Sequence, residues 1–145
     1  MDSITPTLTP TPISQIASYH AHIYFDGPAQ RAHAMVLREQ IGQRFGVALG
    51  SIHDRLVGPH SRPMYQVSFD LASFATFVPW LMLNRQGLAV LVHPNTGRER
   101  DDHLLHGAWL GEVLPIVNAE MLRNDAPPEA ALPVNTQPRL GVSDD

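Results

Sequence analysis

The amino-acid sequence predicts an α+β domain in which an antiparallel sheet carries its two main helices on one face. Three observations predict this class. The chain of 145 residues has the length of a single domain, 43% of its residues are hydrophobic, and strand-like and helix-like apolar patterns alternate along it. We therefore expect one packed core between a sheet and its helices.

The first half of the predicted core contains a strand, a helix and a second strand. Residues 19–25 are rich in aromatic and β-branched side chains, which favour a strand. The turn at Asp26 and Gly27 leads into a helix that has proline in its first turn and ends at Gly46. Residues 47–51 alternate apolar with smaller or polar side chains, which predicts a second strand. The apolar stripe of the helix consists of Ala34, Leu37, Ile41 and Phe45.

After a loop over residues 54–62, the same kinds of pattern return. Residues 64–69 alternate and predict a third strand, and residues 71–86 predict a second helix that ends at Gly87. Residues 88–92 are continuously apolar, which predicts a strand in a covered position. The resulting order, β-α-β-β-α-β, is the ferredoxin-like split βαβ arrangement with an antiparallel sheet.

Two shorter elements complete the predicted unit. A short C-terminal helix is expected over residues 103–110, with Asp101 or Asp102 as its cap, and residues 112–117 are expected to add an edge strand. Both main helices lie on one face of a ferredoxin-like sheet, so the other face needs a cover. A partner subunit, an extra segment or a ligand would each provide it.

Both ends of the chain are rich in proline and offer little apolar surface to bury. Seven of the 13 prolines lie in these ends. The sequence therefore predicts a flexible Thr/Pro-rich head over residues 1–15, a folded domain over residues 16–121 and a flexible Pro-rich tail over residues 122–145.

Composition and charge exclude several classes of site and partner. The absence of cysteine excludes disulfides, iron–sulfur clusters and thiolate zinc sites, so a metal would need histidine or carboxylate ligands. The net charge of -4, with only 10 Lys and Arg, argues against a nucleic-acid surface. No stretch is long and apolar enough to span a membrane, and no secretory signal is recognisable, so a cytoplasmic protein is expected.

Histidine is the residue type that indicates function, because imidazole is the commonest metal ligand and titrates near neutral pH. His20 and His22 lie two apart in the first predicted strand, so both side chains leave the same face. Their Cα atoms should be about 6.5–7 Å apart, a span that two imidazoles can close onto one ion. The structural alternative is a pair of half-buried histidines that bond to their neighbours.

Three further histidines have a supporting context. His93 ends the fourth strand before a proline, which holds it extended, and this strand neighbours the first one in a ferredoxin-like sheet. His60 lies in a loop between glycine and prolines, and His103 follows a run of charged residues. Each also has a structural alternative as a loop, cap or surface histidine. No supporting context exists for the remaining three, His33, His53 and His106.

Taken together, these segments resemble the DOPA 4,5-dioxygenase family, in its small fungal and bacterial type. The resemblance spans residues 19–111, and the order and spacing of its motifs both match. The segments that carry it are 19–26 (YHAHIYFD), 58–60 (GPH), 78–81 (VPWL) with 84–85 (NR) and 87–88 (GL), 92–97 (VHPNTG), 102–103 (DH) and 108–111 (AWLG).

The resemblance implies a ferredoxin-like domain that pairs as a homodimer and cleaves a catechol ring with O₂ at a non-haem Fe(II). Three protein ligands would leave room in an octahedral shell for both catechol oxygens and O₂. Zn²⁺ is expected as an adventitious occupant, because it outcompetes Fe²⁺ at most such sites. The expected site assigns His20, His22 and His93 to the metal, His60 and His103 to catalysis as base, acid or hydrogen-bond partners of the substrate, and Arg62 and Tyr24 to substrate binding.

Two questions stay open at the level of sequence. The site either uses three histidines or receives a carboxylate from the late segment, with Glu99, Asp102 and Glu112 as candidates. The main alternative function is a non-catalytic module of ferredoxin-like fold that binds a metal or a small aromatic molecule. A structural dimerisation domain with core histidines is the third hypothesis.

Overall fold

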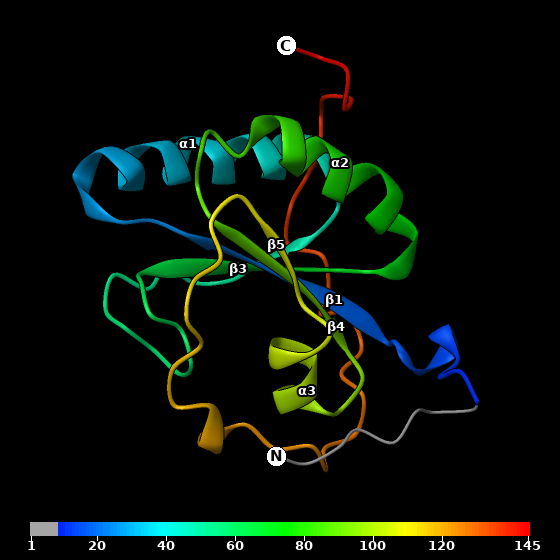
Figure 1. Ribbon diagram of the computed structural model, residues 1–145. Coiled ribbons are helices and arrows are strands. Elements are labelled where there is room, and N and C mark those ends of the chain that lie inside the picture. Colours follow the sequence, from blue (N-terminus) through cyan, green and yellow to red (C-terminus); the bar gives the residue numbers. More distant parts are fainter. Residues whose placement is uncertain (1–8) are drawn as a thin grey trace.

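The computed structural model describes residues 9–145 and contains one antiparallel sheet of five strands (Figure 1). The strands follow the order β2-β3-β1-β4-β5, so β1 lies at the centre of the sheet. The predicted α+β class with an antiparallel sheet is confirmed. The strands are β1 (Ser18–Tyr24), β2 (Ala48–Leu49), β3 (Met64–Phe69), β4 (Val90–Asn95) and β5 (Ala108–Leu110).

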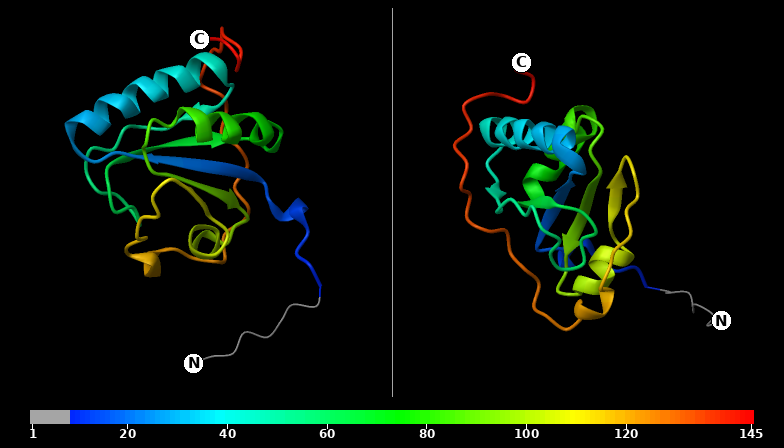
Figure 2. Two further views of the ribbon diagram at one scale, coloured as in Figure 1. Left: turned by 45° about the horizontal axis from the view of Figure 1, so that its top comes forward. Right: turned by 90° about the vertical axis from the view of Figure 1, so that its left-hand side faces the viewer.

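The two long helices cover one face of the sheet, and a short helix covers part of the other. Helices α1 (Gly27–Arg44) and α2 (Phe74–Asn84) lie above the sheet in Figure 1, whereas α3 (Glu99–Leu104) lies below it. Figure 2 shows the same two layers from other directions. An extra segment of the chain therefore provides cover for the second face. Three-residue 3₁₀ turns occur at Ile13–Gln15, Leu71–Ser73 and Ala119–Met121.

The main core lies between the sheet and the two long helices. Alternate side chains of β1 enter it, because successive residues of a strand point to opposite faces. Ala21 and Ile23 are completely buried there, against Leu37 and Ile41 of α1. Tyr65 of β3 joins this core and donates a hydrogen bond of 2.8 Å from its hydroxyl to the Ala34 carbonyl. The intervening residues of β1 consequently point to the face that carries α3.

The helix predicted over residues 103–110 is wrong in its position. The chain reverses at Gly97, whose φ of +88° is in the left-handed region, and α3 begins directly afterwards at Glu99. Asp101 and Asp102 lie inside this helix rather than at its cap, in a first turn where negative charge complements the helix dipole. Residues 108–110 instead form β5, which pairs with β4 and satisfies the backbone groups of its outer edge.

The edge strand predicted over residues 112–117 is also wrong. The structure has only an isolated antiparallel bridge here, between His60 and Ile116. Pro115 has no backbone N–H to donate, which interrupts a ladder at this point. The bridge nevertheless ties the loop that carries His60 to the segment after β5.

The C-terminal segment contains no strand or long helix, but it follows the outer edge of the sheet (Figure 2). The side chain of Asn135 accepts a hydrogen bond from Leu49 N (2.8 Å) and donates one to Leu49 O (2.9 Å). The hydroxyl of Thr136 accepts a hydrogen bond from Val47 N (3.0 Å) and donates one to the Phe45 carbonyl (2.7 Å). The predicted division into head, domain and tail stays a prediction, and the first eight residues of the head lie outside the described residues.

None of the helices within residues 9–145 is sufficiently long and apolar to cross a membrane.

The packing of α1 gives a direct test of the core. Leu37 is fully buried, whereas the neighbouring Val36 is 51% exposed on the same helix. We expect Leu37→Ala to lower the free energy of unfolding by about 2–5 kcal/mol, because it removes buried methyl groups and leaves a cavity. The matched control Val36→Ala should change it by about 0.5 kcal/mol or less. Urea denaturation measures both, and equal effects of the two substitutions would contradict the described burial.

Candidate metal centre

Five histidines meet on the face of the sheet opposite the long helices. His20 and His22 leave β1 on this face because Ala21 between them belongs to the core. His93 lies directly opposite His20 in the register of β1 and β4. His103 comes from α3, and His60 from the loop before β3. All five line one cavity of about 270 Å³.

The imidazole rings are close enough to share an ion. The Nε2 atoms of His22 and His93 are 3.1 Å apart. One ring nitrogen from each of His20, His22 and His93 lies within 4.8 Å of the other two, and the same holds for a second triad. That second triad consists of His22, His60 and His103, so His22 belongs to both.

Two of these rings have their tautomer set by a backbone carbonyl. Nδ1 of His93 lies 2.9 Å from the Pro94 carbonyl oxygen, and Nδ1 of His103 lies 2.7 Å from that of Glu99. A carbonyl oxygen only accepts hydrogen bonds, so Nδ1 must carry the proton in both rings. Each neutral ring therefore keeps an unprotonated Nε2, whose lone pair can bind a metal or accept a proton.

His60 has the opposite tautomer, because its partner is a buried tyrosine. The Tyr24 hydroxyl lies 2.7 Å from Nδ1 of His60, and Tyr24 is 1% exposed. Among the described residues this hydroxyl has no other hydrogen-bond partner, so its proton is satisfied only if it donates to Nδ1. Burial also raises the pKa of Tyr24, which keeps the hydroxyl protonated. The neutral His60 ring consequently carries its proton on Nε2.

Two buried nitrogens of the cluster have no partner within residues 9–145. They are Nε2 of His20 and Nδ1 of His22. A buried polar atom without a hydrogen bond is costly, and in a native protein it often marks an ion or a catalytic role. Two nitrogens that bind one ion at about 2.1 Å, at nearly a right angle, would be about 3 Å apart. The separation of 3.1 Å between His22 and His93 fits such a pair.

The surroundings keep the cluster uncharged at neutral pH. Burial, with a smaller contribution from the nearby His103, lowers the pKa of His20 from 6.5 to about 4. Burial followed by the influence of His103 likewise lowers the pKa of His60 to about 4. For His22 and His93, burial and the neighbouring imidazoles hold the pKa well below 6.5. Neutral imidazole is the form that binds a metal, so the cluster is prepared for one.

The carboxylates near the cluster differ in what they contact. Asp102 is buried and accepts hydrogen bonds from the backbone N (2.9 Å) and hydroxyl (2.8 Å) of Thr96, so it stabilises the turn between β4 and α3. Glu99 lines the cavity with Asp102. Glu112 instead pairs with Arg62, at 3.3 Å, outside the lining of the cavity. Glu129 also lines the cavity, and nothing in the irregular Pro-rich tail signalled it in the sequence.

The two residues expected to bind substrate do not line the cavity. Arg62 lies in its ion pair with Glu112, and Tyr24 lies behind His60, with its ring stacked 5.7 Å from that of Trp109. Their predicted contact with substrate stays a prediction. The three histidines without supporting context, His33, His53 and His106, also lie outside this cavity.

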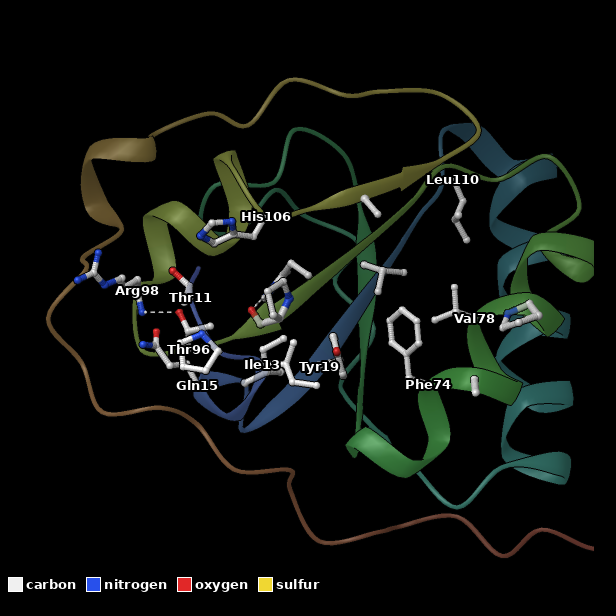
Figure 3. Close-up of a pocket in the computed structure, with 18 of the residues that line it drawn as sticks. Thr11, Ile13, Gln15, Tyr19, Phe74, Val78, Thr96, Arg98, His106 and Leu110 are labelled. Atoms are coloured by element: carbon white, nitrogen blue, oxygen red, sulfur yellow. Dashed lines mark hydrogen bonds between the residues drawn. The ribbon is translucent and has the colours of Figure 1, made fainter. Parts of the chain in front are cut away.

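A larger pocket of about 730 Å³ lies beside the edge of β4 (Figure 3). Tyr19, Phe74 and Val78 form its apolar side, and Thr96 and His106 lie toward its other end. It touches His93 but none of the other four histidines of the cluster. Its lining offers no grouping of metal ligands, so we place the chemistry in the smaller cavity.

The histidine cluster predicts how stability depends on pH. An unfolded histidine binds a proton near pH 6.5, whereas His20 and His60 in the folded protein do so only near pH 4. Between these values the unfolded chain binds more protons, so the free energy of unfolding of the metal-free protein should fall as pH falls from 6.5 to 4.

Urea denaturation between pH 7 and pH 4 measures this dependence. His60→Gln should make it less steep, because one titrating group is removed, while substitution of the exposed His33 by glutamine provides the matched control. A free energy of unfolding that stays constant or rises over this range would contradict the burial of neutral histidines.

Comparisons with known proteins identify the family of this chain. Residues 19–120 match the Dopa 4,5-dioxygenase family, a region that contains all five clustered histidines. The protein named DOPA 4,5-dioxygenase of Amanita muscaria is 32% identical over 111 residues, which are 71% of this chain and 49% of that protein. An uncharacterized 21.2 kDa protein of Botryotinia fuckeliana is 34% identical over 110 residues, which are 68% of this chain and 60% of that protein. The chain thus spans half to three fifths of the length of these relatives.

A solved structure is similar as well. The crystal structure of a "putative dioxygenase" from Nostoc punctiforme superposes with a TM-score of 0.74 at 48% sequence identity. The match covers 77% of this chain and 95% of that one. The family match covers well over half of the sequence and includes the complete histidine cluster. This chain belongs to the Dopa 4,5-dioxygenase family.

Proposed function

We propose that this protein is an extradiol dioxygenase, which opens the aromatic ring of a DOPA-like catechol with O₂ at a non-haem Fe(II). Membership of the family supports a dioxygenase. The observation that carries the proposal is the cavity in which four buried, neutral histidines and the half-buried His103 offer two overlapping triads. A purely structural cluster would be expected to pair its buried nitrogens, yet two of them have no partner within the described chain.

His20, His22 and His93 are the proposed metal ligands. His93 presents an unprotonated Nε2 to the Nε2 of His22, and His20 brings an unpartnered nitrogen to the same place. The second triad is less suitable, because the Tyr24 hydroxyl fixes the proton of His60 on Nε2, whereas the proton of His22 can move to its Nδ1, which has no partner within the described chain. These nitrogen donors suit Fe²⁺ but also Zn²⁺, which is the expected adventitious occupant.

The two remaining histidines then have complementary roles. Fe(II), when bound, would supply coordination positions for the two catechol oxygens and for O₂. His103 has an unprotonated Nε2, so it is the proposed base that accepts a proton from the catechol hydroxyl. His60 is neutral and carries its proton on Nε2, so it is the proposed hydrogen-bond donor to a catechol oxygen, and the protonated His103 returns its proton to the cleaved product. Tyr24 is a positioning residue in this scheme, since it acts through His60.

The finer features of the fold and assembly belong to the same proposal. The strand order β2-β3-β1-β4, with two helices on one face, supports the ferredoxin-like description. The homodimer rests on the family resemblance alone. The open sheet face that would need a partner carries α3 and the segment after β5 instead (Figure 1).

Metal binding and O₂ consumption test the proposed function together. Protein reconstituted anaerobically should bind one Fe(II) per chain and, on addition of a catechol and air, consume O₂ and form a yellow ring-opened product. His22→Gln should weaken metal binding by about 100-fold or more with an unchanged circular dichroism spectrum, since His22 belongs to both triads. The matched control is His106→Gln, outside the cluster. A protein that binds metal and a catechol without O₂ uptake would instead be a binding module.

The tautomer of His60 is a separate prediction. Two-bond ¹⁵N–¹H correlation spectra of the metal-free protein should show the proton of neutral His60 on Nε2. Tyr24→Phe removes the donor to Nδ1, so the tautomer should shift toward Nδ1–H. In the active enzyme the same substitution should lower kcat more than it changes KM, by up to about 10²–10³, as for the loss of one donor to a developing negative charge. An Nδ1–H tautomer in the unsubstituted protein would contradict the assignment of His60 as the hydrogen-bond donor to the substrate.

A further inference from the structure

Among residues 9–145, the open side of the histidine cavity carries negative charge and no positive side chain. Its lining contains the carboxylates of Glu99, Asp102 and Glu129 but neither arginine nor lysine. Asp102 is buried and both of its oxygens accept hydrogen bonds from Thr96. Glu99 and Glu129 are exposed, so they are the two carboxylates that an entering ligand would meet.

Glu129 is held at the cavity by a contact of its own backbone and by contacts of the segment just before it. Gly97 packs closely against the segment before Glu129. A Cβ atom at position 97 would collide with the Ala126 carbonyl oxygen. Ala126 N also donates a hydrogen bond of 3.1 Å to the Gly97 carbonyl. The hydroxyl of Ser18 donates to the Glu129 carbonyl and accepts a hydrogen bond of 2.8 Å from Asn95. The backbone of Glu129 is therefore fixed to both β1 and β4.

The carboxylate of Glu129 lies close to the proposed ligands. Its Oε1 is 3.7 Å from Nε2 of His20, the buried nitrogen without a hydrogen-bond partner. The side chain of Glu129 is 49% exposed, so it borders both the cavity and solvent. A catechol that binds through its two oxygens at the histidines would direct its ring substituent away from them, toward this open side. The residue lies beyond the region that matches the family, residues 19–120.

We propose that Glu129 is a specificity-determining residue that favours catechols with a cationic substituent, such as a protonated amine, over those with a carboxylate. This inference rests on the proposed function, because it requires a catechol in the histidine cavity. A metal ion would attract the oxygens of every catechol equally, so it does not alter the comparison between substituents. The difference comes from the charge that the substituent brings to Glu129, with no arginine or lysine in the lining to compensate for it.

Anaerobic binding of three catechols of similar length tests the proposal without turnover. The probes are 3,4-dihydroxyphenethylamine, 3-(3,4-dihydroxyphenyl)propionate and the neutral 4-propylcatechol, titrated against Zn²⁺-loaded protein at low ionic strength. The amine should bind most tightly and the carboxylate most weakly. Glu129→Gln should reduce the ratio of the amine and carboxylate affinities by about fivefold, as expected for a partly exposed ion pair. Affinity for the neutral catechol should change little.

Glu39→Gln is the matched control, because Glu39 is an exposed glutamate of α1 outside the histidine cavity. An unchanged affinity ratio in Glu129→Gln, or equal affinities of the three probes for the unsubstituted protein, would overturn the role of Glu129 and leave the proposed function intact. Failure of all three catechols to bind would overturn both.

Discussion

The alternation of side chains along β1 is the constraint on which the rest of the structure depends. This strand lies at the centre of the sheet, so each of its residues must suit one of two enclosed environments. Ala21 and Ile23 enter the apolar core under α1 and α2. His20 and His22 enter the cavity on the other face, and Tyr24 follows them to bond with His60. A shift of one residue in register would turn the histidines toward the helices and would turn Ala21 and Ile23 toward the cavity.

Burial explains how such a cluster stays uncharged and ready for a metal. Five imidazoles in one small cavity would repel one another if they were protonated, and the low-dielectric surroundings disfavour each charge. The pKa values of His20, His22, His60 and His93 accordingly lie well below 6.5. Hydrogen bonds to groups behind the rings then determine which nitrogen carries the proton in His60, His93 and His103. The carbonyls of Pro94 and Glu99 and the hydroxyl of Tyr24 perform this task.

Local patterns predicted the parts of the fold that a single segment determines. The two-residue alternation around His20 and His22 is visible in the sequence, and the order of the elements placed His93 on the neighbouring strand. The position of α3 and the strand β5 could not be predicted, because residues 108–110 pair with β4 only after the turn at Gly97 brings them alongside it. Glu129 could not be predicted for a similar reason. Its place depends on long-range contacts with Ser18 and Gly97, not on a local pattern.

The central claim is that His20, His22 and His93 hold one iron ion in the cavity below β1. Anomalous diffraction at the iron edge, from crystals of protein reconstituted anaerobically with Fe(II), tests this claim most directly. The claim predicts one anomalous peak per chain, at bonding distance from a nitrogen of each of these three rings. A peak bound by His22, His60 and His103 would contradict the assignment of ligands, and the absence of a peak in the cavity would contradict the metal centre itself.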